Sequence, residues 1–297
     1  MKILLAAAAL ARIWTPATIA SDQYEATPTF TPDGREMYFM QSDPRFERYR
    51  LVWSRCENGA WSKATAVPFA APGVQEGDPG VTPDGKRLYF ISMRHDPSGE
   101  DFDIWHVDRT SVGTWSEPQR LPEPVNSKGS ELLPRADREG RLYFGSDRPG
   151  GFGQGDIYVA TQGADGTWTV RNVGPPVSTA AYEYEAEISH DGRTLVAVVD
   201  RGDRSHLYRF ERSGSRWIER ERIPAFAKVF QVGPLLSPTG DRLLFAQADG
   251  ASSGELFLID LLERPDERWP ACSGATTARS AWRSRRNRAS RTALRSA

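Results

Sequence analysis

The sequence predicts an all-β chain folded as a β-propeller of four-stranded antiparallel blades. Three observations predict this class: a turn that ends in glycine, a short apolar run after it, and a tryptophan that closes the unit, each repeated five times. The units recur at roughly 50 residues, a period typical of propeller blades. Outside the N-terminus, no sustained helical period of apolar residues runs through the chain. The five repeats leave open whether the ring has five blades or belongs to a six-bladed propeller.

Each unit is expected to begin with a strand that carries a Glu-x-x-Pro signature. The five units start near residues 24, 75, 130, 182 and 230. Their acidic position holds Glu25, Glu76, Glu131, Glu183 and, in the last unit, Gln231. Their proline position holds Pro28, Pro79, Pro134, Ala186 and Pro234.

A tight turn and a second strand follow in every unit. The turn glycines are Gly34, Gly85, Gly140, Gly192 and Gly240, and three of the turns have a proline two residues before the glycine. Proline presets φ and glycine supplies a positive φ, so the chain can reverse between two strands. The second strands are predicted at 37–39, 88–90, 142–144, 195–197 and 243–245.

A polar loop then leads to the third strand, and a tryptophan opens the fourth. The third strands are predicted at 51–53, 104–107, 157–159, 207–210 and 256–259, and the tryptophans are Trp61, Trp115, Trp168, Trp217 and Trp269. Each blade can bury its apolar strands only against its neighbours, so an isolated unit should not fold. We therefore predict one domain over residues 21–269.

The repeats resemble those of the PD40, or TolB-like, family of WD40-like propellers. The residues that carry the resemblance are the runs 30–34 and 81–85 and, above all, the run 142–158, LYFGSDRPGGFGQGDIY. The resemblance spans about residues 24–269 and implies a bacterial envelope propeller, usually six-bladed, that binds other macromolecules. In TolB a small α/β domain precedes the propeller. Here the first repeat follows the leader-like segment directly, so we expect no such domain between them.

The N-terminus resembles a secretory leader over residues 1–20. Lys2 precedes an apolar run from Ile3 to Ala11, and small residues stand at Thr18 and Ala20. A basic start, a short apolar core and small residues predict cleavage near Ala20, so we expect a periplasmic or secreted protein. Arg12 interrupts the pattern, and a disordered or mis-started N-terminus is the alternative. The run is too short for a transmembrane span, and the two cysteines, Cys56 and Cys272, predict no disulfide framework.

The repeat pattern stops after Trp269. Residues 270–297 contain seven Arg, no Lys and no acidic residue. Three interpretations stay open: a frameshifted tail that replaces a missing fourth strand and further repeat, a disordered tail, or a basic binding tail. Residues 1–269 hold all 39 acidic residues and 31 of the 38 basic ones, a net charge of −8. A mildly acidic propeller is a poor nucleic-acid binder, so no nucleic-acid partner is predicted.

Two motifs that would indicate a metal or redox site are missing from the sequence, which contains no His-Glu-x-x-His and no Cys-x-x-Cys. A Gly-x-Ser-x-Gly is present at residues 250–254, but it lies in a loop between a predicted second and third strand and not in the strand-to-helix turn that positions a nucleophile. The carboxylates of Glu100, Asp101 and Asp103 could bind Ca²⁺, but the other positions of a calcium loop are absent, and a solvated loop is the better interpretation. We predict no cofactor, no metal and no catalytic residue.

One rim of the propeller is the candidate binding surface. The connection into the first strand and the loop between the second and third strands emerge on the same face of a blade. The first carries the repeat acids Glu25, Glu76, Glu131 and Glu183, and the second carries Asp43, Arg94, Arg148, Arg201 and Asp249. These charges either form blade-to-blade ion pairs or line a recognition surface with the long loops 43–49, 94–103 and 148–156.

Two functional classes remain. The first is a non-catalytic, monomeric envelope propeller that binds a protein, peptide or glycan partner through this rim. The second is a glycan-active hydrolase or lyase, which would need two carboxylates about 5–10 Å apart in the central funnel. The repeat acids recur once per blade, whereas catalytic residues tend to break a repeat. We therefore favour the binding propeller and predict that the chain is not an enzyme.

Overall fold

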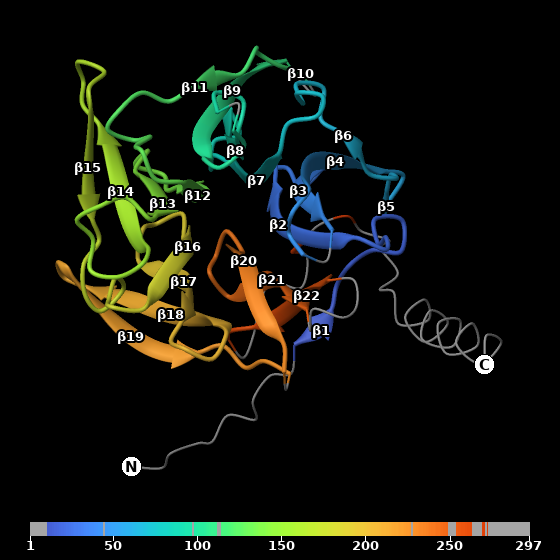
Figure 1. The fold of residues 1–297 in the computed structure, drawn as a ribbon. Coiled ribbons are helices and arrows are strands. Elements are labelled where there is room, and N and C mark those ends of the chain that lie inside the picture. The colour runs from blue at the N-terminus through green and yellow to red at the C-terminus, as the bar shows by residue number, and fades with distance from the viewer. Residues whose placement is uncertain are drawn as a thin grey trace, which may run out of the picture.

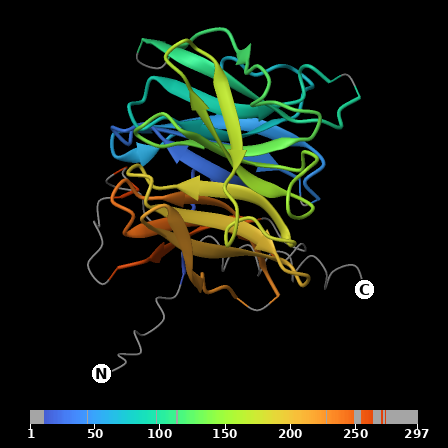
Figure 2. The ribbon, with the colours of Figure 1, turned by 90° about the vertical axis from the view of Figure 1, so that its left-hand side faces the viewer.

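The computed structural model is an all-β propeller of five blades. It describes residues 11–43, 45–96, 98–111, 114–226, 228–248, 254–262, 269–270 and 272. Figure 1 shows the propeller viewed along its axis, with the first strand of each blade nearest the centre. Figure 2 shows the propeller from the side. Within the described residues, no helix is long and apolar enough to span a membrane.

The blades follow one another along the chain, and all strand pairs within them are antiparallel. Blade one has β2 (Tyr24–Phe30), β3 (Glu36–Ser42) and β4 (Tyr49–Glu57), with the short β5 (Ala60–Trp61) and β6 (Thr65–Ala66) both paired to β4. Blade two repeats this plan with β7 (Glu76–Val81), β8 (Arg87–Ser92), β9 (Asp103–Ser111), β10 (Thr114–Trp115) and β11 (Gln119–Arg120). Blade three has β12 (Glu131–Ala136), β13 (Leu142–Ser146), β14 (Asp156–Gln162) and β15 (Trp168–Asn172). Blade four has β16 (Tyr182–Ile188), β17 (Thr194–Asp200), β18 (Ser205–Ser213) and β19 (Arg216–Arg222).

Blade five takes its fourth strand from the other end of the chain. Its sheet contains β20 (Phe230–Leu236), β21 (Arg242–Ala248) and β22 (Glu255–Asp260), and β1 (Arg12–Ile13) pairs with β22. Arg12 forms a bidentate ion pair with Asp260, at 2.9 and 3.1 Å, and Trp14 is buried. The N-terminal segment therefore pairs with β22 at Phe257 and Leu258. The interpretations of the tail stay predictions.

The first strands form a closed ring around the axis. They lie against one another in the order β2, β7, β12, β16, β20 and back to β2, so the ring closes with five blades rather than six. Four of them contain a bulge in which a residue has a positive φ: Thr27 (49°), Asp78 (51°), Leu133 (45°) and Gly233 (61°). The repeat proline follows each of these residues, in the position where a strand tolerates proline because the ladder is interrupted.

The turns and inter-blade cores follow the sequence pattern. All five turn glycines have φ between 67° and 77°. Buried apolar side chains form clusters between successive blades, for example Tyr38 and Leu51 of blade one with Leu88 and Phe90 of blade two. The largest cluster joins blades four, five and one and includes Trp14 and Ile19 from the N-terminal segment.

The expectation about the two cysteines was wrong. Cys56 on β4 forms a disulfide with Cys272, across a sequence separation of 216 residues. Ring closure brings the two ends of the chain together, which a one-dimensional count of cysteines does not reveal. Trp269 lies between blades one and five, at the junction that we call the seam. Its ring centroid is 6.1 Å from that of Phe30, and its carbonyl oxygen accepts a hydrogen bond from Arg242.

Of the predicted leader 1–20, residues 1–10 lie outside the described residues, whereas residues 11–20 belong to the fold through β1, Trp14 and Ile19, which cleavage near Ala20 would remove. Of the predicted tail 270–297, residues 271 and 273–297 lie outside the described residues.

Candidate functional site

The repeat acids predicted on the binding rim are buried. Glu25, Glu76, Glu131 and Glu183 each expose 2% or less of their surface. Each carboxylate accepts hydrogen bonds from the segment that enters its blade: from Ser21 to Glu25, from the Ala71 amide to Glu76, from Ser127 to Glu131 and from Thr179 to Glu183. Burial raises the pKa of Glu25 and of Glu131 to about 7 and raises that of Glu183 as well.

Two of the predicted arginines pair with these acids inside the same blade. Arg94 contacts Glu76 at 2.6 Å, and Arg148 contacts Glu131 at 2.9 Å. The Arg148 guanidinium also lies over the ring of Tyr158, 4.8 Å from its centroid. Arg201 instead pairs with the exposed Glu219 and lies over Tyr208. The sequence analysis had offered ion pairs between blades. The pairs Arg94–Glu76 and Arg148–Glu131 instead lie within single blades.

From these contacts we infer that the charged residues of the rim hold the neighbouring loops in place. The remaining positions do the same: Asp43 accepts hydrogen bonds from the Glu47 amide and from Arg48, and Gln231 bonds the Leu207 amide and the Pro224 carbonyl. Asp249 lies outside the described residues. The predicted binding role of this rim therefore rests on the loops that the charges position, and it stays a prediction.

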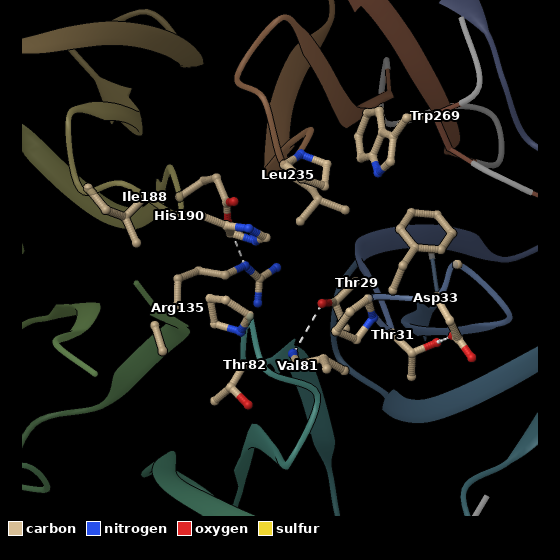
Figure 3. Close-up of a pocket in the computed structure, with 17 residues that line it drawn as sticks. Thr29, Thr31, Asp33, Val81, Thr82, Arg135, Ile188, His190, Leu235 and Trp269 are labelled. Atoms are coloured by element: carbon tan, nitrogen blue, oxygen red, sulfur yellow. Dashed lines mark hydrogen bonds and ion pairs between the residues drawn. The ribbon is translucent and has the colours of Figure 1, made fainter. Parts of the chain in front are cut away.

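An arginine crosses the axis of the propeller. Arg135 extends from β12, pairs with Glu187 at 2.8 Å and donates to the Pro79 carbonyl at 2.5 Å and to the Pro28 carbonyl at 3.5 Å. Glu187 also accepts from the Leu236 amide. This pair, which we call the axial ion pair, contacts all five blades. Figure 3 shows Arg135 at the centre of the ring. Burial raises the pKa of Glu187 to about 7 against the opposing charge of Arg135.

On one side of the axial ion pair lies a small pocket among the Asp-Gly turns, on the side that we call the turn face. Its volume is about 140 Å³, and it is shown in Figure 3. Arg135, Thr29, His190 and Trp269 are among its lining residues. Burial and the charge of Arg138 lower the pKa of His190. A cavity this small suits a few water molecules better than a ligand.

On the other side, toward the long loops, is a larger cavity that we call the axial funnel. Its volume is about 290 Å³. It opens between the half-buried side chains of Phe46, Tyr49, Tyr182 and Phe230 on the side that we call the loop face. Its remaining lining residues are Thr27, Met40, Asp78, Leu132, Tyr184, Glu185 and Val232. This volume is just below the roughly 300–1,000 Å³ of small-molecule sites.

Two buried carboxylates stand in the funnel wall. Asp78 accepts a hydrogen bond from the Leu133 amide at 3.0 Å, and Glu185 accepts one from the Gly233 amide at 2.7 Å. Their exposed fractions are 4% and 8%. Burial raises the pKa of Asp78, and burial together with the charge of Asp78 raises the pKa of Glu185 to about 8. The charge of each acid therefore disfavours ionisation of the other.

Aromatic rings form the rest of the funnel mouth. Tyr182 and Tyr184 lie 4.8 Å apart between ring centroids, and Phe46 lies 5.9 Å from Phe230. Tyr49 stacks on Phe102 of blade two at 5.5 Å. Burial raises the pKa of Tyr49, and so do the charges of Asp78 and Glu185, so its hydroxyl stays protonated.

The sequence analysis missed both funnel acids, although a signal was present. Asp78 and Glu185 stand two residues after the repeat acids Glu76 and Glu183. The three other units carry Thr27, Leu133 and Gly233 at this position. The first strand of each blade lines the axis. Two acids at a first-strand position that is uncharged in the other three repeats therefore distinguish these two blades at the centre of the ring.

Among the residues that the structure describes, one group of side chains has the composition of a metal site. His95, Asp101 and Asp103 bring one ligand atom each within 4.8 Å of one another. However, the Asp103 oxygen that contacts His95 Nδ1 also accepts from Arg120. A guanidinium already supplies the positive charge there, so we assign no metal to this group.

The fold resembles several solved propellers. TolB from Acinetobacter baumannii matches with a TM-score of 0.53 at 17% identity, over 84% of this chain and 57% of that protein. A protein of Agrobacterium tumefaciens assigned as TolB matches with a TM-score of 0.52 at 18% identity, over 82% of this chain and 79% of that one. Zg3597 of Zobellia galactanivorans, a family 117 glycoside hydrolase, matches with a TM-score of 0.58 at 11% identity, over 88% and 93%. The present chain thus spans little more than half of the Acinetobacter protein.

These likenesses concern the fold. No protein-family model and no curated protein matches the sequence. At identities below one fifth, a shared propeller is compatible with binding proteins and with hydrolases alike, so function has to be argued from the site.

Proposed function

We propose that the protein is a non-catalytic, monomeric β-propeller of the cell envelope, periplasmic or secreted, that binds a partner at its loop face. The observation that carries this proposal is the axial funnel, which is lined by residues of the long loops and of the first strands. A partner at the loop face could insert a segment into it. Of protein, peptide and glycan partners, we favour an extended peptide, because the funnel is narrow and lined by aromatic rings.

Exposed apolar side chains on the loop-face connections support this proposal. Phe152, on the loop between β13 and β14, exposes 55% of its surface, and Phe226, before β20, exposes 47%. Both stand on connections of the loop face. Large exposed apolar groups on loops held by a rigid scaffold are typical of interaction surfaces. The buried acids and arginines described above would supply the rigidity.

Site-specific photo-crosslinking in the host tests the proposal. A photoreactive residue at position 152 or 182 on the loop face should give a discrete adduct, and one at position 84 or 191 on the turn face should not. Adducts of equal yield from both faces, or none from the loop face, would contradict binding at the funnel mouth.

The envelope location rests on two features of the chain. The first is the leader-like N-terminus, and the second is the Cys56–Cys272 disulfide, because such bonds persist in oxidising compartments. Recovery of the protein from periplasm or medium, with its N-terminus sequenced, tests this. A chain with intact Met1 in the cytosol would contradict export, and a start near Ser21 would mean a blade five without β1.

A glycan-active enzyme is the second candidate. Asp78 and Glu185 form a carboxylate pair in an aromatic funnel, and their mutual influence on pKa favours it. Each acid, however, already accepts a backbone hydrogen bond from the next blade, which is what a structural tie requires. Reducing-end assays over a panel of polysaccharides decide between the two: turnover abolished in D78N and E185Q would favour the enzyme.

A further inference from the structure

The axis of the propeller holds more negative than positive groups. Three carboxylates, those of Asp78, Glu185 and Glu187, surround the guanidinium of Arg135. Arg135 gives its shortest contacts to Glu187 and to the Pro79 carbonyl oxygen, on the side of the turn face. The two funnel acids receive backbone amides from Leu133 and Gly233. The funnel therefore contains two acids whose charge the axial arginine does not fully balance.

The walls beside these acids suit a cation. Tyr49, Tyr182, Phe46 and Phe230 border the space above Asp78 and Glu185. Aromatic faces attract ammonium and guanidinium groups, most strongly where water is excluded. A neutral sugar would also stack on such rings, but it would not compensate two buried carboxylates.

We propose that the axial funnel binds a primary ammonium or guanidinium group, presented on an extended peptide by lysine, arginine or the amino terminus. The cation lies on Asp78 and Glu185, and its alkyl stem lies along the aromatic walls. A cavity of about 290 Å³ accepts one side chain and leaves the rest of the peptide on the loop face. This inference rests on the proposed function and adds the chemical class of the bound group.

Binding of a cation should release protons. The titratable and charged groups that face the site are Asp78 of β7, Arg135 of β12, Tyr182, Tyr184, Glu185 and Glu187 of β16, and Tyr49 of β4. With the pKa of Glu185 at about 8, the empty pair retains a proton near neutral pH. An entering cation favours the doubly ionised pair, so affinity should rise as pH increases from 6 to 8.

Calorimetry with the full chain provides the test. The probes are a short peptide with one central lysine, the same peptide with that lysine acetylated, and spermidine. We expect the lysine peptide to bind at least about tenfold more tightly than its acetylated form. Titrations at pH 7 in buffers of different ionisation enthalpy should show about one proton released per peptide.

Variants locate the site. D78N and E185Q should each weaken the lysine peptide at least about tenfold, and Y182L should weaken it less. E219Q, on the outer strand of blade four, is the matched control and should bind as wild type does. Y182L leaves both acids in place, so it tests the site even where an acid variant fails to fold.

The outcomes separate the two proposals. Equal binding of the acetylated peptide, unchanged binding in D78N and E185Q, or binding of spermidine alone would each overturn a peptide cation as the occupant. If loop-face crosslinking persists while the lysine peptide fails to bind, the binding function stands and the cation inference falls. If turn-face crosslinks dominate while the lysine peptide binds, the reverse holds.

Discussion

Blades four and five cover their third strands in different ways. Blade four is one continuous segment whose fourth strand, β19, pairs with β18 from Tyr208 to Ser213. Blade five receives only the two-residue β1 from the distant N-terminus, and the Cys56–Cys272 bond lies at the same seam. Each repeat thus supplies three strands, while the fourth position needs only enough backbone and apolar surface to cover part of the third strand.

Removal of residues 1–20 should be the most destabilising change, because it strips blade five of this cover. It removes β1 with the buried side chains of Trp14 and Ile19, each worth about 1.5–3 kcal/mol, and the ion pair of Arg12. We expect a loss of roughly 3–6 kcal/mol, measured by urea denaturation. The matched control is removal of residues 1–10, which keeps β1 and should change little. Equal stability of the two truncations would mean that β1 does not support blade five.

Replacement of Arg135 by methionine should rank next, since it affects every blade. It leaves Glu187 buried without its partner, and breaking a buried pair from one side costs about 3–5 kcal/mol. Thermal unfolding checks the loss. The double variant R135M/E187L removes both charges and should recover part of the stability. A double variant weaker than R135M would show that the axis depends on polar contacts rather than on charge balance.

Loss of the disulfide should cost about 2–4 kcal/mol, because the bond constrains a very long stretch of the unfolded chain. C56S and C272S should lower the melting temperature by the same amount as each other. A reductant should lower that of the wild type to the same value and leave both variants unchanged. Wild-type protein insensitive to reductant would contradict the bond's role in closing the seam.

The smallest expected effect is a dependence of stability on pH at the entrance to blade one. The folded pKa of Glu25 is about 7, above its unfolded value, so its contribution to stability is present below about pH 4.5 and is lost as pH rises through 7. E25Q should flatten this decline, visible as a smaller difference in melting temperature between pH 5 and pH 8. E131Q tests the same linkage in blade three, where Arg148 partly opposes the shift.

The fold could be predicted because its signals are local. The turn at Gly85, the apolar run of β8 and the tryptophan Trp115 each report their own backbone geometry, and five copies establish the architecture. Pro79 could be placed in a first strand, but the bulge at Asp78 that accommodates it became visible only in the structure. Blade number depends on the angle between blades, which no single repeat encodes.

The site was harder to predict because it is assembled across blades. Glu76 and Glu131 were conspicuous through repetition, and the structure shows that repetition marked a role in every blade. Asp78 and Glu185 come from blades two and four and meet only when the ring closes. The pairing of β1 with β22, like the disulfide, is a consequence of the same closure. Contacts that form only when the ring closes cannot be predicted from the sequence of a single repeat.

The reach of Arg135 has a consequence for how the molecule unfolds. Open repeat arrays can lose one end while the remainder stays folded, since each unit contacts only its neighbours. Here the guanidinium of Arg135, from blade three, is bonded to three other blades, and its partner carboxylate is bonded to the fifth. Separation of any blade therefore exposes a charge at the centre of the ring. Partial fraying becomes costly everywhere, and the protein should melt in a single transition in which calorimetric and van't Hoff enthalpies agree.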